Sequence, residues 1–358
     1  MSSKKISTDK EIVYEPKLEH IDVEITKRCN LACIHCSAQS NSIGRDLSST
    51  EIAAVLNKAS TLGLKYVGVT GGEPLVRRRK LMTVLRSCRR ISNLKVHLHT
   101  NGTLLTSKDA SLLAGLVDEI TITFLGSKPE THDGVTLVKG SLRATEEGLR
   151  RLMDERANVT IFVVPMKLNL KEVPQIVKKV KDIGCSRIRI LSLSPTGRAV
   201  SDFANLSLDS KDKEWLIEKL IQTQKELDIN IEAGFCTRQD YPRLDRLLGH
   251  SSCLAAENRV HIDAFGEVFP CTAASGWPEL SAGNLRDHNL NLSNIWRLSS
   301  VFRSLRSFRS KPPLKCRSCA LYPQCMGGCR VIMYYKYRNI NLARPDCKPQ
   351  SMFPDPLS

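Results

Sequence analysis

Short runs rich in apolar and β-branched residues alternate with helical stretches over residues 21–193. The six runs are Ile21–Thr26, Lys65–Thr70, Lys95–Thr100, Glu119–Phe124, Val159–Val164 and Arg187–Leu193. Several are almost continuously apolar, which is typical of parallel strands that helices cover. Between the first two, a Ser48-Ser-Thr-Glu51 capping box precedes an apolar helical pattern that ends at Gly63. Six such repeats predict an α/β domain, either doubly wound or barrel-like.

The strand–helix alternation stops near residue 200. Residues 210–227 predict an amphipathic helix. Its apolar side consists of Leu216, Ile217, Leu220, Ile221 and Leu227. From about residue 229 onward the repeat is lost, and this part of the chain contains eight cysteines. We therefore divide the chain into a core over residues 1–205, a linking helix and bridging segment over 206–250, and a smaller cysteine-rich domain over 251–358.

Composition places the protein inside the cell. The 358 residues are 41% hydrophobic, and the N-terminal residues lack the apolar core of a signal peptide. The longest apolar stretch, Val159–Met166, is too short to span a bilayer. We expect a soluble cytoplasmic protein that does not bind membranes. In a reducing compartment the thirteen cysteines are more often metal or cluster ligands than disulfides.

Three cysteines follow the first predicted strand directly, in the sequence Cys29-Asn-Leu-Ala-Cys33-Ile-His-Cys36. Three thiolates in so short a loop can each bind one iron of a cubane cluster. The fourth iron then has no protein ligand and is open to an exogenous one. The alternative is a zinc site completed by His35, but that residue lies between two ligands in a very short loop. Because the motif follows the first strand, we favour a partial barrel of six βα units over a doubly wound sheet.

The C-x₃-C-x₂-C spacing of Cys29, Cys33 and Cys36 resembles the signature of the radical S-adenosylmethionine (SAM) superfamily. The resemblance implies that these cysteines hold a [4Fe–4S] cluster whose open iron chelates the methionyl group of SAM. Reductive cleavage then yields a 5′-deoxyadenosyl radical that abstracts hydrogen from a substrate.

Two further segments, at the ends of the second and third predicted strands, support this resemblance. Gly71-Gly72-Glu73-Pro74 is similar to the family's GGEP motif, and Thr100-Asn101 with Gly102 is frequent at the next strand end. The resemblance assigns SAM binding to Gly71, Gly72, Glu73, Pro74, Thr100 and Asn101. Taken alone, each segment would be read as a turn.

The chain departs from the family pattern after the fourth strand. Relatives with a cysteine-rich extension carry Ser-Leu-Asp-Gly there, whereas this chain has Thr123-Phe-Leu-Gly126. After the sixth strand, Pro195-Thr-Gly-Arg198 resembles the usual ending, or is a turn.

A second cysteine array lies in the C-terminal domain. It comprises Cys253, Cys271, Cys316, Cys319, Cys325, Cys329 and Cys347, with Gly266 opening a G-x₄-C segment. The array resembles the SPASM extension of radical SAM enzymes, whereas a pair of zinc ribbons would need eight ligands.

The SPASM pattern implies two auxiliary [4Fe–4S] clusters. Cys316, Cys319, Cys325 and Cys347 would hold one of them. Cys253, Cys271 and Cys329 would hold the other, with an open iron or a fourth ligand such as Cys236.

The remaining cysteines have other expected roles. Cys88 and Cys185 are predicted to be small buried hydrophobes. Cys236 is a candidate hydrogen donor, as in epimerases of the superfamily. Thr272 stands where sulfatase-maturing relatives have a catalytic aspartate, so that role is not transferred to it.

The formal net charge is +16, and cluster-bound thiolates and irons would bring it to about +12. A basic cleft attracts acidic substrates or partners, although a solvated surface rich in lysine and arginine explains the charge equally well. A helix over residues 293–309 carries four arginines, which we expect to be solvated. With 5% aromatics, base recognition by a non-enzymatic iron–sulfur or zinc nucleic-acid-binding protein has little support.

Family resemblance favours a ribosomally synthesised peptide as substrate, modified by crosslinking, epimerisation or oxidation. The alternatives are a tetrapyrrole undergoing decarboxylation and a sugar or aminocyclitol undergoing oxidation or epimerisation. We expect a flavodoxin- or ferredoxin-type electron donor. Only about twenty residues precede the first strand, which weakens the peptide interpretation without removing it, because a separate protein can supply leader-peptide recognition.

Overall fold

The computed structural model describes residues 16–233, 253–319, 322 and 326–343. Three residues singled out by the sequence, Cys236, Cys325 and Cys347, lie outside the described residues. Within the described part, no helix is both long enough and apolar enough to cross a bilayer.

One ten-stranded sheet runs through the described chain in the order β10-β9-β8-β1-β2-β3-β4-β5-β6-β7. The strands are β1 His20–Glu24, β2 Tyr66–Thr70, β3 Lys95–Thr100, β4 Glu119–Phe124, β5 Val159–Val163, β6 Arg187–Ile190, β7 Asn230–Ala233, β8 Arg259–Ile262, β9 Glu267–Phe269 and β10 Gly283–Asn284. Strands β1 to β8 pair in parallel, while β9 and β10 are antiparallel. The six predicted strands are therefore confirmed, and the sheet continues on both sides of them.

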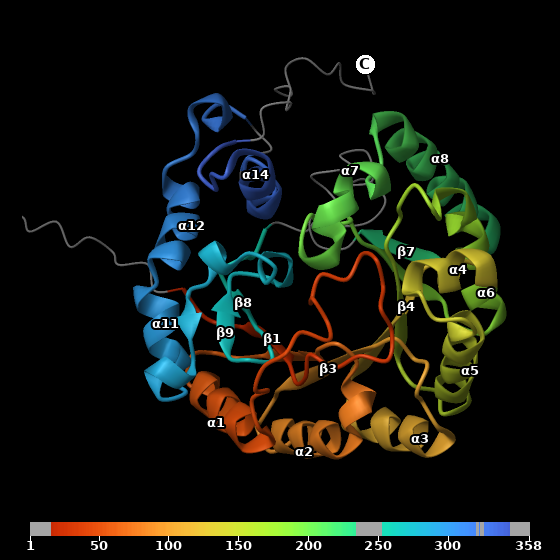
Figure 1. Cartoon of the computed structure of the whole chain (residues 1–358), viewed down its shortest axis with the longest axis horizontal. Helices are drawn as coiled ribbons and strands as arrows, with labels where there is room; N and C mark the ends of the chain where they lie inside the picture. Colours follow the sequence, from red (N-terminus) through yellow and green to blue (C-terminus); the bar gives the residue numbers. More distant parts are fainter. Residues whose placement is uncertain (1–15, 234–252, 320–321, 323–325, 344–358) are drawn as a thin grey trace, which may run out of the picture.

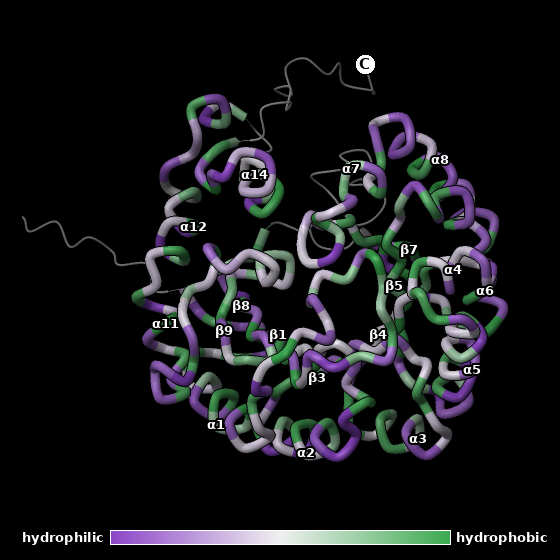
Figure 2. The backbone as a smooth tube through the Cα atoms, viewed as in Figure 1, coloured by the Kyte–Doolittle hydropathy of each residue, from purple (hydrophilic) through white to green (hydrophobic). Residues whose placement is uncertain are grey.

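Helices form an outer layer around the curved sheet (Figure 1). They are α1 Ser49–Ser60, α2 Arg78–Cys88, α3 Ser107–Leu116, α4 Pro129–Thr136, α5 Ser141–Asp154, α6 Val173–Asp182, α7 Phe203–Leu206 and α8 Ser210–Leu227. The predicted capping box of α1 is present, because Ser48 and Glu51 exchange both hydrogen bonds. The helix predicted over 210–227 is α8. Along this outer layer, hydrophobic and hydrophilic residues alternate within each helix (Figure 2).

The C-terminal helices are α11 Leu292–Leu298, α12 Ser300–Ser310 and α14 Arg330–Tyr337. The single helix expected over 293–309 is wrong, because the backbone of Ser299 leaves the helical region and its hydroxyl caps Phe302 at the start of α12. Arg306 also differs from expectation. Its guanidinium lies 4.1 Å from the Trp296 ring centre and donates to the carbonyls of Ala256 and Trp296 at 2.7 Å. Arg306 therefore joins α12 to α11 and to the segment before β8, and it is not a solvated surface residue.

The two faces of the sheet differ sharply in polarity. The outward side chains of β1–β8, such as Ile21, Val67 and Ile122, join the helices in one large apolar core. Cys88 and Cys185 belong to this core, as predicted. The opposite, inner face carries His20, Asp22, Glu24, Tyr66, His97, His99, Glu119, Thr121, Thr160, Phe162, Arg189, Glu232, Arg259 and His261. The apolar residues of the strands thus pack against the helices, and the polar residues line the inside of the barrel.

Two helical glycines provide a matched test of this packing. A methyl group on Gly148 of α5 would lie 2.1 Å from the carbonyl oxygen of Gly102, at the end of β3. A methyl group on Gly115 of α3 would meet nothing within 4 Å. Gly148→Ala should lower the free energy of unfolding by about 1–3 kcal/mol, because α5 must move away from the strand end. Gly115→Ala should raise it by up to about 1 kcal/mol through helix propensity.

Urea unfolding followed by circular dichroism measures both effects. Equal stability of the two variants would show that α5 does not pack on Gly102 as described.

Candidate active site

The three cysteines of the first motif lie on the loop that follows β1, over the middle of the ring of strands (Figure 1). Cys29, Cys33 and Cys36 are free thiols. Burial raises the pKa of Cys29 to about 11 and that of Cys33 to about 12, and the nearby charge of Cys36 adds to both effects. The metal-free thiols of Cys29 and Cys33 are therefore protonated at neutral pH, and cluster binding must displace their protons.

This loop, residues 29–41, has no regular secondary structure, so its backbone groups need partners elsewhere. The last turn of α4 supplies two of them, since the amides of Ala32 and Ile34 donate to Thr136 and Val135 at 3.0 Å. The side chain of Asn41 accepts from the Cys29 amide at 2.9 Å. The loop is thereby fixed on the side of α4.

A buried charged group supports the loop from the β8 side. Lys27 donates to the carbonyl of Ala38 at 3.0 Å and forms ion pairs with Glu24 at 2.7 Å and Asp263 at 3.5 Å. Burial opposes the charge of Lys27, but the two carboxylates outweigh it and raise the pKa of Lys27. Such a buried pair costs desolvation energy and is retained where position matters.

Gly71 and Gly72 pack directly on the backbone of the residues that lead into the cysteine loop. A Cβ on Gly71 would lie 2.5 Å from the Thr26 carbonyl, and one on Gly72 would lie 2.4 Å from that of Arg28. The amides of Gly72 and Glu73 donate to the same two carbonyls at 2.8 Å. Their lack of a side chain is thus required by close packing within the protein, whereas the sequence had suggested close approach of a ligand.

Glu73 joins the ends of β2 and β3. Its fully buried carboxylate accepts from the amides of Leu75 and Asn101 at 2.9 and 2.7 Å and from the Thr100 hydroxyl at 2.8 Å. Burial outweighs these hydrogen bonds and raises the pKa of Glu73. Pro74 is buried at the start of the 3₁₀ helix η1, Pro74–Arg77.

Asn101 links the ends of β2 and β3 to the cysteine loop. Its side-chain amide donates to Asn30 at 3.0 Å and lies 4.0 Å from the Cys29 sulfur. The residues assigned by resemblance to SAM binding therefore surround the cysteine loop. The side chains of Glu73 and Thr100 are already engaged within the protein.

The unusual Thr123–Gly126 turn also has a structural explanation. A Cβ on Gly126 would lie 2.5 Å from the His132 amide, so α4 can approach β4 only with glycine here. The Nδ1 atom of His132 accepts from the Leu125 amide at 3.3 Å. Burial lowers the pKa of His132 to about 4, which keeps the ring neutral and able to accept this bond.

His35, the fourth ligand that a zinc site would need, has a buried Nδ1 atom with no hydrogen-bond partner among the described residues. Burial lowers its pKa to about 4. Across the described ranges, no three His, Cys, Asp or Glu side chains converge as a single-ion site would require. Three thiols on one short loop can instead each bind a different iron of a cubane.

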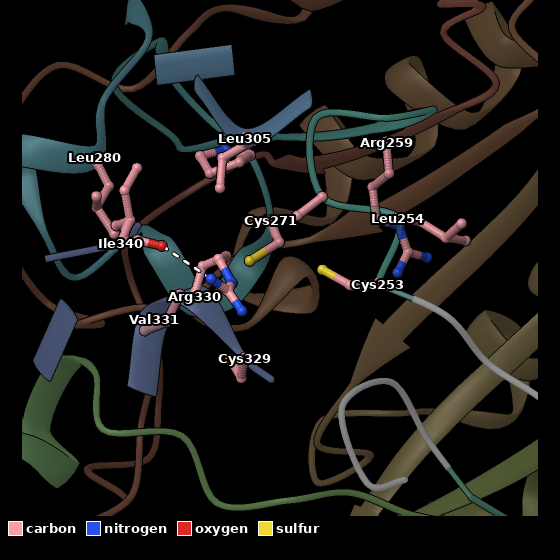
Figure 3. Close-up of a pocket in the computed structure, with 12 residues that line it drawn as sticks. Cys253, Leu254, Arg259, Cys271, Leu280, Leu305, Cys329, Arg330, Val331 and Ile340 are labelled. Atoms are coloured by element: carbon pink, nitrogen blue, oxygen red, sulfur yellow. Dashed lines mark hydrogen bonds between the residues drawn. The ribbon is translucent and has the colours of Figure 1, made fainter. Parts of the chain in front are cut away.

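The structure brings three cysteines of the second array to one pocket (Figure 3). Cys253 precedes β8, Cys271 follows β9, and Cys329 precedes α14, and all three line the pocket together with Arg259 and Arg330. Burial raises the pKa of Cys271 to about 12, and the negative charges of Cys329 and Cys253 add to this effect. Three thiols from three separate segments around one pocket suit a three-cysteine cluster.

Cys316 and Cys319 lie on adjacent turns at the end of the 3₁₀ helix η8, Leu314–Cys316. The Cys319 amide donates to the Cys316 carbonyl at 3.2 Å. Phe308, Tyr322 and Met326 form an apolar cluster around them. The two remaining cysteines of this group, Cys325 and Cys347, are outside the described residues.

Two features of the site were missed from sequence. Arg198 binds the cysteine loop through four hydrogen bonds, and only its position in a family-like turn hinted at a role. The other is a buried chain in which Glu24 contacts His261 at 3.1 Å and His261 contacts Thr272 at 3.4 Å. Polar residues at alternate positions of β1 and β3 indicate the polar inner face. This alternation was not recognised because several strands are almost continuously apolar.

The comparison with protein families decides the identity of this arrangement. The model of the Radical SAM superfamily matches residues 23–231. The chain belongs to the Radical SAM superfamily. The model of SPASM, an iron–sulfur cluster-binding domain, matches residues 253–320. The protein is therefore a radical SAM enzyme with a [4Fe–4S] cluster and SAM as cofactors, and its SPASM domain implies auxiliary iron–sulfur clusters.

Similar proteins act on different molecules. The AdoMet-dependent heme synthase of Methanosarcina barkeri is 28% identical over 87% of this chain and 90% of its own length. The mycofactocin maturase MftC of Mycobacterium tuberculosis is 27% identical over 90% of this chain and 81% of its own length.

Streptococcus suis SuiB, solved with its precursor peptide SuiA, has the same fold. The TM-score is 0.75 at 19% identity, over 91% of this chain and 75% of that structure. This likeness confirms the predicted partial barrel followed by a SPASM domain.

Proposed function

We propose that this radical SAM enzyme abstracts a hydrogen atom from a ribosomally synthesised peptide during its maturation by crosslinking, epimerisation or oxidation. Cys29, Cys33 and Cys36 would hold the catalytic [4Fe–4S] cluster, which with bound SAM would supply the radical that abstracts the hydrogen atom. Gly71 to Pro74, Thr100 and Asn101 form the surrounding wall at the ends of β2 and β3. The convergence of these segments on the cysteine loop supports the assignment.

The polar inner face of the barrel is the observation that carries the substrate class. His97 of β3, Arg189 of β6 and Glu232 of β7 are partly accessible, with 26, 25 and 31% of their side chains exposed. Arg189 and Glu232 form an ion pair at 2.8 Å, and the Arg189 guanidinium lies 5.7 Å from the Phe162 ring centre. A wall with charged groups of both signs suits a peptide, which brings amides and charged side chains of its own.

A tetrapyrrole is the second candidate, because the heme synthase relative covers most of this chain. Pockets for large planar ligands are mainly lined by apolar and aromatic side chains. On the inner face of β1–β8, aromatic rings other than histidine come from Tyr66 and Phe162. The maturase MftC and SuiB with its bound precursor peptide favour the peptide, and a sugar or aminocyclitol has no specific support here.

The auxiliary clusters follow the SPASM pattern. We assign one to Cys253, Cys271 and Cys329, which share a pocket, and the other to Cys316, Cys319, Cys325 and Cys347. Cys236 is proposed as a hydrogen donor, or as the fourth ligand of the first auxiliary cluster. The proposed external partners are a flavodoxin- or ferredoxin-type electron donor and a separate leader-peptide recognition protein. The basic charge of the chain supports an acidic electron donor.

Iron content tests the cluster assignment. Anaerobically reconstituted protein should bind about twelve irons, four in each of three cubanes. Replacing Cys29, Cys33 and Cys36 together by alanine should remove about four irons and leave about eight. The matched control is Cys88→Ala, which removes a buried cysteine of the apolar core and should leave the iron content unchanged. Loss of all iron in the triple variant, or stoichiometric zinc in the wild type, would contradict three separate clusters.

Isotope transfer tests the substrate class. The enzyme is incubated with SAM, dithionite and a perdeuterated precursor peptide encoded beside its gene, and 5′-deoxyadenosine is analysed by mass spectrometry. Deuterium should appear in the product. Arg189→Gln should reduce this transfer about tenfold, which corresponds to the loss of roughly one charged contact. The control Arg187→Gln, at the opposite end of β6, should leave the transfer unchanged. Transfer from a deuterated propionate-bearing tetrapyrrole, with none from the peptide, would replace the peptide by the second candidate.

A further inference from the structure

The segment Pro195–Arg198, which follows β6, lies between the cysteine loop and the SPASM domain. We propose that Arg198 is a positioning residue that fixes the cysteine loop, and that the SPASM domain sets the geometry of the catalytic cluster through this segment. The inference rests on the proposed function, in which Cys29, Cys33 and Cys36 hold that cluster. It adds a mechanical role for the SPASM domain to the auxiliary clusters that the domain implies.

Arg198 binds the second half of the cysteine motif and the residues just after it, from Cys33 to Ser40. Its amide donates to the Cys36 carbonyl at 3.0 Å, and its Nε atom donates to the Cys33 carbonyl at 2.8 Å. Its two terminal nitrogens donate to the carbonyl and hydroxyl of Ser40 at 2.9 and 3.0 Å. The Ser40 hydroxyl is in turn 3.5 Å from the Cys36 sulfur. A planar guanidinium can satisfy these acceptors together, whereas a lysine ammonium is a single point charge.

Gly197 brings the segment into direct contact with the same loop. Its φ is +60°, and a Cβ there would lie 2.2 Å from the carbonyl oxygen of Cys36 and 2.8 Å from that of Ser37. The backbone of residues 197 and 198 therefore lies against the final cysteine of the motif with no side chain between them. A shift of this segment must move Cys36 or break its contacts.

The SPASM domain contacts the segment Pro195–Arg198 on the side opposite the cysteine loop. A Cβ on Gly276 would lie 2.1 Å from the Thr196 hydroxyl oxygen and 2.6 Å from the Gly197 amide nitrogen. The indole nitrogen of Trp277 donates to the Pro195 carbonyl at 3.0 Å. Trp277 belongs to the same buried apolar cluster as Cys329, with Cys271 packed against it. Contacts thus continue from Cys36 through Gly197, Thr196 and Gly276 to the auxiliary cysteines.

Arg198 also places a positive charge beside the catalytic cysteines, because its Nε atom lies 2.8 Å from the Cys33 carbonyl oxygen. The reduction potential of an iron–sulfur cluster depends on nearby charge, hydrogen bonding and solvent exposure. Electron uptake adds negative charge, which a fixed cation favours. Loss of Arg198 should therefore make the catalytic cluster harder to reduce.

The test uses reconstituted full-length holoenzyme. Arg198→Gln should keep the iron content of the wild type but shift the midpoint potential of the catalytic cluster to more negative values. With dithionite it should form 5′-deoxyadenosine about tenfold more slowly. Arg198→Lys keeps the positive charge but loses the planar guanidinium. Its midpoint potential should lie between those of Arg198→Gln and the wild type. Its electron paramagnetic resonance (EPR) spectrum with SAM should still differ from that of the wild type.

Gly276→Ala tests the coupling from the SPASM side. It should change the EPR spectrum of the SAM-bound catalytic cluster without loss of iron, whereas Gly115→Ala, with open space around it, should not. Adding Thr196→Ala removes the oxygen at 2.1 Å and should reverse part of the change. The effects of Gly276→Ala and Arg198→Lys should be less than additive, because both act on one segment.

The inference is overturned if Arg198→Gln and Gly276→Ala retain iron and leave the potential and the SAM-bound spectrum unchanged. It is also overturned if Gly276→Ala acts only by losing auxiliary iron. The proposed function itself would be contradicted by a different result, namely a catalytic-cluster signal that persists in the Cys29, Cys33 and Cys36 triple variant.

Discussion

The structure depends on how an irregular loop that carries three cysteines is held in place. Residues 29–41 satisfy only some of their backbone groups with one another, so α4, Lys27 and Arg198 supply further partners. Gly71 and Gly72 complete the support by packing on the carbonyls that lead into the loop. A cubane needs its ligands at fixed separations, so rigid support before metal binding lowers the cost of ordering the loop.

The division of the sheet into an apolar outer face and a polar inner face follows from the same arrangement. Helices bury the outer face and provide the stability of the domain, as the single large apolar core shows. The inner face is then free to carry charged residues, which are paired where they are most buried. Although burial opposes it, the charge of Arg259 keeps the pKa of Asp22 well below its usual range.

The sequence predicted the elements that depend on local pattern. The six strands, the α1 capping box and the helix over 210–227 follow from periodicity and caps, which act over a few residues. Contacts between distant segments were not predictable in this way. Arg306 binds Ala256, and Arg198 binds Cys33, across 50 and 165 residues. The break at Ser299 was missed because a continuous apolar stripe outweighed one capping serine.

If Cys29, Cys33 and Cys36 hold the iron that binds and cleaves SAM, their loss must stop formation of 5′-deoxyadenosine. This product is quantified from SAM and dithionite under anaerobic conditions. None should form with the variant in which all three cysteines are alanine. A variant with Cys316 and Cys319 replaced should still form some, without substrate turnover, because dithionite can reduce the catalytic cluster directly. Robust formation of 5′-deoxyadenosine by the triple variant would contradict the account.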